Sequence, residues 1–137
     1  MRRNPKDEAL RWLAQAEDEY ADAVHLMDRR RFYLSLFLAQ QSAEKALKAF
    51  MYWKEQEHVF THSVGELLKL ALSLDEDFRS VQDARRLDDY YIPTRYPNGL
   101  PGDIPSRYFD DPIEVKRALE WSDKVISMVR EKLKNSG

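Results

Sequence analysis

The sequence contains no cysteine among its 137 residues. Disulfide bonds, thiol nucleophiles and thiolate metal ligands are therefore excluded. There are only three histidines, His25, His58 and His62, so we expect no multi-histidine metal site and no other cofactor. Long apolar runs and the apolar stretch of a signal peptide are also missing, which predicts a cytoplasmic protein without a membrane segment.

An excess of basic residues is missing too, because the formal net charge is -2. A surface that coats nucleic acid over its whole extent is excluded, and any contact with a nucleotide or RNA needs a local basic patch. Hydrophobic residues make up 43% of the chain and charged residues 34%, a composition typical of folded globular proteins. We predict a single domain over residues 1–137.

The remaining patterns are helical, and no strand pattern competes with them. Asn4 and Pro5 form a helix start, as do Asp111 and Pro112, since each pair combines a capping side chain with a first-turn proline. Ser63-Val-Gly-Glu66 is a capping box, and Pro93 ends the helix before it. The expected helices cover about residues 5–29, 32–53 or 54, 63–74, 75–91 and 111 to near the C-terminus.

Apolar residues at helical spacing predict which faces are buried. The second helix carries Phe32, Leu36, Ala39, Ala43, Ala46, Leu47, Phe50 and Trp53. The expected buried residues of the third are Leu67, Leu68, Leu70, Ala71, Leu72 and Leu74. Those of the last are Val115, Ala118, Leu119, Val125, Ile126, Val129 and Leu133. These stripes predict an all-α, up-and-down bundle of four long helices and one short helix.

A long loop precedes the last helix and has a proline at every fourth position from Pro93 to Pro105. It contains a small repeat, Pro93-Thr-Arg95-Tyr96 and Pro105-Ser-Arg107-Tyr108. Long loops in compact domains are usually functional or disordered. The prolines and aromatic residues favour an ordered loop that lies against the bundle.

The second helix has an unusual outer face. Leu34, Phe37 and Leu38 make its first half apolar on both sides, which predicts contact with another helix or with a second subunit. Further along, Gln41, Glu44, Lys45 and Lys48 share one face. Two ammonium groups there would hold a phosphate, with Gln41 adding a directional hydrogen bond. The alternative is an ordinary surface ion pair between Glu44 and Lys48.

Two further segments supply candidate ligand-binding residues. Arg95 offers a planar fork for a phosphate and Tyr96 a ring on which a base stacks, while the alternative is that both anchor the loop. His62, just before the third helix, would carry a proton or donate to an anion, or else serve only as a local hydrogen-bond partner.

Three segments together resemble the HEPN family of nucleotide-binding helical domains. They are Ala39-Gln-Gln-Ser-Ala-Glu-Lys-Ala-Leu-Lys-Ala49, Thr61-His62-Ser-Val64 and Tyr91-Ile-Pro-Thr-Arg-Tyr-Pro97. The resemblance covers nearly the whole chain. It implies a homodimer in which Leu34, Phe37 and Leu38 face the second subunit. It also implies a polar cleft for nucleotides or RNA, which includes Tyr91, and a separate small nucleotidyltransferase as partner.

Many HEPN proteins are metal-independent ribonucleases with an Arg and a His separated by four to six residues. None of the three histidines of this chain has an arginine at that spacing before it. We therefore expect a non-catalytic nucleotide- or RNA-binding module, and name no catalytic residue. One alternative is a ribonuclease toxin of a toxin–antitoxin pair that uses His62 or Arg95. The other is a purely structural dimeric interaction protein, in which Lys45→Glu and Lys48→Glu would leave function intact.

Overall fold

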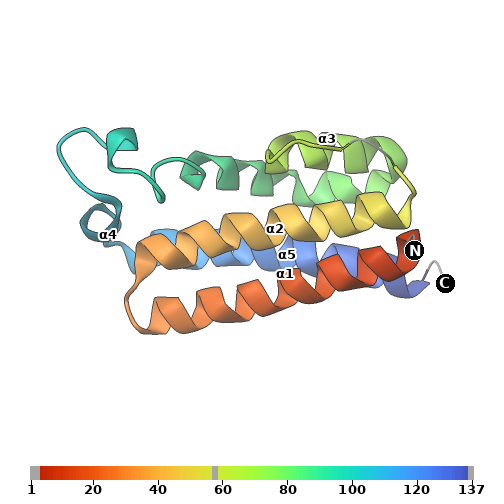
Figure 1. Ribbon diagram of the computed structural model, residues 1–137, viewed down its shortest axis with the longest axis horizontal. Coiled ribbons are helices and arrows are strands. Elements are labelled where there is room, and N and C mark those ends of the chain that lie inside the picture. The colour runs from red at the N-terminus through yellow and green to blue at the C-terminus, as the bar shows by residue number, and fades with distance from the viewer. Residues whose placement is uncertain (1–3, 57–58, 136–137) are drawn as a thin grey trace.

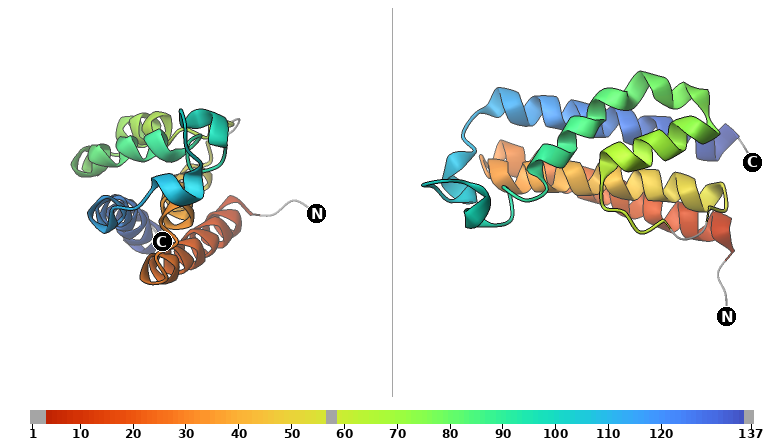
Figure 2. Two further views of the ribbon diagram at one scale, coloured as in Figure 1. Left: turned by 90° about the vertical axis from the view of Figure 1, so that its left-hand side faces the viewer. Right: turned by 90° about the horizontal axis from the view of Figure 1, so that it is seen from above.

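A computed structural model describes residues 4–56 and 59–135. Three long helices, α1 (Pro5–Asp28), α2 (Phe32–Trp53) and α5 (Pro112–Asn135), pack along one another. Across them lies a second layer made of α3 (Val64–Leu74) and the 3-10 helix η1 (Glu76–Tyr90) (Figure 1; Figure 2). The described part of the chain contains no strand, which confirms the predicted all-α bundle.

The helix starts follow from local capping. The Asn4 side chain accepts a hydrogen bond of 2.8 Å from the amide of Lys6, and Pro5 occupies the first turn of α1. Asp111 caps α5 in the same way through the amide of Ile113, at 2.9 Å. These caps satisfy amides that have no partner within the helix. The observed bounds of the long helices therefore lie within one residue of those predicted.

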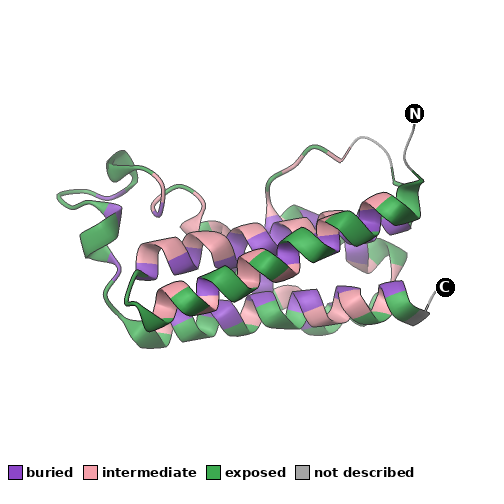
Figure 3. Cartoon of the chain, turned by 60° about the horizontal axis from the view of Figure 1, so that its bottom comes forward, coloured by how far each residue is buried: buried purple, intermediate pink, exposed green. Residues whose placement is uncertain are grey.

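The core lies among α1, α2 and α5 and continues between these helices and the second layer, and buried residues occur on each of them (Figure 3). All the predicted core residues of α2 and α5 are buried. In α3 the prediction was partly wrong, since Leu70 and Leu74 are 43% and 38% exposed and Leu72 is only partly buried. A helix this short presents one face to α2 and η1, and Leu67, Leu68 and Ala71 occupy that face.

The loop after η1 is ordered and includes two short helical turns, η2 (Pro97–Gly99) and α4 (Pro105–Tyr108). A proline occupies the first turn of each, where its fixed backbone angle suits a helix start. Thr94 is buried, and its hydroxyl donates to the Tyr90 carbonyl at 2.5 Å. The loop reaches beyond the end of the bundle, and α4 returns to contact α2 (Figure 1).

Within residues 4–56 and 59–135, no helix is both long enough and apolar enough to cross a membrane.

Candidate functional site

The structure brings together most of the residues that the sequence singled out. Seven of them form what we call the α2-face cluster: Gln41, Glu44, Lys45 and Lys48 from α2, His62 from the segment before α3, and Tyr91 and Arg95 from the turn after η1. Glu44 lies at its centre and is only 4% exposed. Its Oε2 atom accepts from Lys48 Nζ at 3.0 Å and lies 3.2 Å from Nδ1 of His62.

The other polar groups on this face also have protein partners. Lys45 Nζ donates to Glu19 of α1 at 3.0 Å. Gln41 Nε2 donates to Gln40 Oε1 at 2.6 Å. Both lysines that we expected to bind a phosphate are thus paired with carboxylates, and an anion would compete with Glu19 and Glu44 for them.

Arg95 is the cation of the cluster that lacks a carboxylate. Its guanidinium carbon lies 4.2 Å from the centre of the Tyr91 ring and 4.5 Å from that of Phe37. Aromatic faces attract cations, so the two rings hold the guanidinium in place. Among the described residues no carboxylate lies within ion-pair distance of it. The Tyr91 ring also stacks on His62, with centroids 6.1 Å apart.

Two buried polar atoms of this cluster have no hydrogen-bond partner in the described chain: Glu44 Oε1 and Arg95 Nε. Burying a polar atom without a partner costs about 1–3 kcal/mol, and most native proteins avoid it. One orphan is an acceptor and the other a donor. Both atoms are covered by protein, so a ligand with a donor and an acceptor would satisfy them only after the covering side chains move.

The predicted site residue that stands apart is Tyr96, whose side chain is 51% exposed and has no described ring contact with the cluster. Phe37, which we expect at a subunit interface, contacts Arg95 within its own chain and remains partly exposed. Leu34 and Leu38 are also partly buried within one chain. His58 lies outside the described residues. No group of three or more potential metal ligands occurs among the residues that are described.

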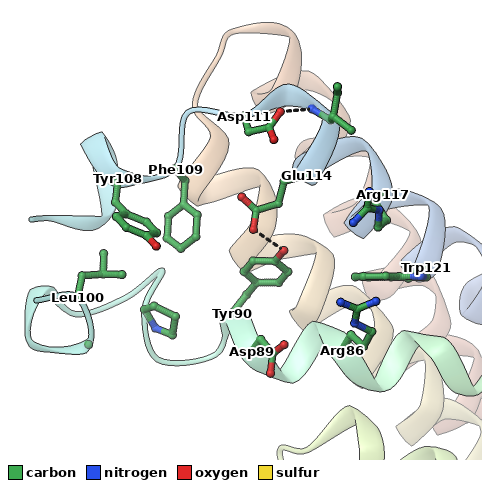
Figure 4. Close-up of a pocket in the computed structure, with 13 residues that line it drawn as sticks. Arg86, Asp89, Tyr90, Leu100, Tyr108, Phe109, Asp111, Glu114, Arg117 and Trp121 are labelled. Atoms are coloured by element: carbon green, nitrogen blue, oxygen red, sulfur yellow. Dashed lines mark hydrogen bonds between the residues drawn. The ribbon is translucent and has the colours of Figure 1, made fainter.

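A groove of about 520 Å³ lies on the other side of the 91–95 turn, and the sequence did not indicate it (Figure 4). We call it the loop groove. Its walls come from η1, from the proline-rich loop and from the first half of α5. Most of its residues are distant in sequence and carry no motif, although Pro93 and Tyr108 belong to the repeat in the long loop. The long loop was the one signal that a site might lie here.

Tyr90 is at the centre of the loop groove and donates a hydrogen bond of 2.8 Å to Oε2 of Glu114 (Figure 4). Burial, followed by this hydrogen bond to a carboxylate, raises the pKa of the Tyr90 hydroxyl well above its ordinary value. Tyr90 is therefore a neutral hydrogen-bond donor over the physiological pH range. Its hydroxyl links the end of η1 to the first turn of α5.

Comparison with known proteins gives a consistent result. The HEPN domain family matches residues 9–132. The crystal structure of TT1696 from Thermus thermophilus is similar, with 33% identity, a TM-score of 0.79, and coverage of 90% of this chain and 97% of that one. ST0689, an archaeal HEPN homologue, has 24% identity, a TM-score of 0.75, and coverage of 97% and 99%, which shows a shared fold. No curated protein matches the sequence significantly.

Proposed function

Because this chain belongs to the HEPN domain family, we propose that it is a nucleotide- or RNA-binding helical module. In this proposal it does not catalyse a reaction and works with a separate small nucleotidyltransferase. The ligand lies on the α2-face cluster. The observation that carries the proposal is Arg95, a cation held between Tyr91 and Phe37 with a buried Nε and no carboxylate partner in the described chain.

The chemistry of the cluster suits a nucleotide. A guanidinium whose faces are covered by rings still presents N–H donors at its edge, and these match phosphate oxygens. The orphan Oε1 of Glu44 accepts from a ribose hydroxyl or a base amino group once the side chains that cover it move aside. His62 is 63% exposed at its side chain and offers a second face for stacking.

Titration calorimetry with ATP, GTP and a short single-stranded RNA tests the proposal. Arg95→Gln should weaken binding at least about tenfold, because a charge-assisted hydrogen bond contributes about 1.5–3 kcal/mol. Arg107→Gln is the matched control, since Arg107 stands in the second copy of the Pro-x-Arg-Tyr repeat and is exposed. No binding of any probe, or equal effects of both substitutions, would refute the proposed site.

The proposed partnership needs its own measurement. A separate small nucleotidyltransferase encoded beside this chain should co-purify with it. It should also raise its melting temperature in a concentration-dependent way. Melting that does not respond to the partner would leave the nucleotide-binding proposal standing and remove the partnership.

A ribonuclease is the second candidate, and the contact between Glu44 and His62 favours it. A carboxylate bound at Nδ1 orients an imidazole and leaves Nε2 as the atom that takes a proton. Arg95 contacts the same Tyr91 ring as His62, and its charge would stabilise a phosphate there. RNA cleavage that is lost in both His62→Ala and Arg95→Ala would establish this function. No cleavage at high protein concentration would exclude it.

A further inference from the structure

The loop groove has two arginines at one end that none of the interactions above use. Arg86 of η1 and Arg117 of α5 lie on either side of Trp121, and the Arg86 guanidinium carbon is 5.3 Å from the centre of the indole ring (Figure 4). Both arginines are exposed. Within residues 4–56 and 59–135, neither has a carboxylate at ion-pair distance.

This arrangement of Trp121 and the two arginines is suited to binding an anion. The indole covers one face of the Arg86 guanidinium and fixes its plane, which reduces the side-chain entropy that binding would cost. The N–H groups at the edge of the guanidinium remain free to donate. Arg117 is one helical turn from Trp121 and adds a second positive charge. Two guanidinium groups match an oxyanion with several oxygens, such as a phosphate.

Three carboxylates also line the groove, but none of them lies within ion-pair distance of Arg86 or Arg117, and two are directed to other protein groups. Asp111 caps the Ile113 amide at 2.9 Å, and Glu114 accepts from Tyr90 at 2.8 Å. Asp89 accepts no hydrogen bond from the described residues and lies below Tyr90 at the groove wall (Figure 4). It offers an acceptor for an amino group of a bound ligand.

The opposite end of the groove is apolar and aromatic. Leu100 and Phe109 are each 7% exposed and form the buried floor of this end of the groove. Tyr108 packs edge-on against Phe109, with centroids 5.0 Å apart, and remains 53% exposed. An exposed ring on a fixed support is suited to stacking against a planar base. The groove volume of about 520 Å³ lies within the range of small-ligand sites.

We propose that the loop groove is a second nucleotide-binding site, separate from the α2-face cluster. The phosphate lies on Arg86 and Arg117, and the base stacks on Tyr108, whose ring Phe109 supports. The ligand is either a free mononucleotide or one nucleotide of an RNA strand. Binding here needs no residue of the α2-face cluster, so this inference does not depend on the proposed function.

A charge-matched pair of double variants tests the inference in the full chain. Arg86→Glu/Arg117→Glu reverses both arginines of the groove. Arg85→Glu/Lys116→Glu makes the same change of net charge at the neighbouring exposed residues, which do not line the groove. Calorimetric titrations with AMP, inorganic phosphate and a five-nucleotide RNA give stoichiometry and affinity, and thermal melting shows that both variants are folded.

We expect the groove variant to lose one AMP-binding event, or to weaken it at least about tenfold, while the control keeps it. Inorganic phosphate should bind more weakly than AMP, and Tyr108→Ala should weaken AMP but not phosphate. If RNA binds more tightly than AMP and depends on the same arginines, the ligand is an RNA strand. If the two affinities are equal, the ligand is a mononucleotide. Unchanged AMP binding in the groove variant overturns the inference, as does equal loss in both variants.

The same titrations can refute either proposed site without refuting the other. Loss of AMP binding in Arg86→Glu/Arg117→Glu but not in Arg95→Gln supports the groove and refutes the α2-face site. The reverse result refutes the groove alone. Trp121 provides a direct signal, because a phosphate bound to Arg86 beside its indole ring should change its fluorescence, and Trp121→Phe should remove that change while calorimetric binding persists.

Discussion

Asp88, near the end of η1, accepts a hydrogen bond of 2.8 Å from the hydroxyl of Ser63 at the start of α3. Its two oxygens also accept from the amides of Val64 and Gly65, at 2.7 and 2.9 Å. The first turn of α3 is therefore capped by its own Ser63, which accepts from the Glu66 amide at 3.1 Å, and by a carboxylate from another helix. A negative charge at a helix N-terminus is favourable.

Removal of this carboxylate should destabilise the bundle. We expect Asp88→Ala to lower the free energy of unfolding by about 2 kcal/mol, because it leaves two amides and a hydroxyl without acceptors. Asp83→Ala, an exposed residue on the same helix, should change it by less than about 0.5 kcal/mol. Urea denaturation measures both, and equal effects would show that the cap contributes nothing.

Gly65 provides an independent test of the same cap. A Cβ atom at this position would lie 3.2 Å from Oδ2 of Asp88, closer than ordinary packing permits. Gly65→Ala should therefore displace the carboxylate and destabilise the protein, although alanine normally favours a helix by about 1 kcal/mol. In an Asp88→Ala background the same substitution should become neutral or stabilising. Additive effects of the two changes would contradict the proposed conflict.

Tyr90 predicts a stability change at alkaline pH. Burial and the Glu114 carboxylate raise its pKa in the folded state, so the folded protein keeps the proton that the unfolded chain loses. The resulting stability is complete below the unfolded pKa of about 10 and falls by about 1.4 kcal/mol for each pH unit above it. Tyr90→Phe should lower the free energy of unfolding by about 1 kcal/mol at pH 7. Near pH 11 the variant and wild type should be about equally stable.

Denaturation of wild type and Tyr90→Phe at pH 7, 9, 10 and 11 checks this expectation. Tyr96→Phe, which removes the hydroxyl of an exposed ring, is the control. A constant difference between wild type and Tyr90→Phe over this range would show that the hydroxyl loses its proton equally in both states.

Asp75 predicts a change in acid. Burial raises the pKa of this carboxyl, but the hydrogen bond from Lys132, at 2.9 Å, and one from the Asp77 amide outweigh burial and lower it. Stability from a lowered pKa is present above the unfolded pKa of about 3.9 and is lost as the pH falls through the folded value. We expect Lys132→Met to lower the free energy of unfolding by about 0.5–1 kcal/mol at pH 7 and by less at pH 2.5. Lys134→Met, which changes an exposed lysine of the same helix, should have a smaller effect at both pH values.

The proposed homodimer predicts a change of mass in solution. Leu34, Phe37 and Leu38 are partly exposed on α2 and would be covered by a second subunit. Leu34→Asp should halve the mass measured by light scattering without lowering helix content. Phe37→Asp is less informative, because the new carboxylate would pair with Arg95. A Leu10→Asp control changes a leucine that is 51% exposed on α1. A wild-type monomer would contradict the prediction.

The fold could be predicted because its signals are local. Asn4 with Pro5, and Asp111 with Pro112, determine helix starts through contacts within two residues. The face of α2 with Glu44 and Lys48 followed from helical spacing alone. The excess of leucines in α3 misled the burial prediction, because composition does not say how many faces of a helix are covered.

Apart from the pairing of Lys48 with Glu44, the main partners of the charged site residues could not be predicted, because they come from distant parts of the chain. Lys45 pairs with Glu19, which is 26 residues earlier, and Arg95 contacts the ring of Phe37. No local spacing indicates either contact. The loop groove likewise combines η1, the loop and α5, whose relative positions depend on packing of the whole bundle.

The turn that follows η1 has a consequence for how the molecule responds to ligands. Two neighbouring tyrosines belong to different sites, since Tyr90 lines the loop groove and bonds to Glu114 of α5, while Tyr91 contacts His62 and Arg95 in the α2-face cluster. Thr94 ties this turn to the Tyr90 carbonyl, so the two rings are carried on one short rigid piece of backbone. A molecule that shifts this piece from one site alters the other site. Thermodynamic reciprocity then requires each occupant to change the affinity of the other by the same factor.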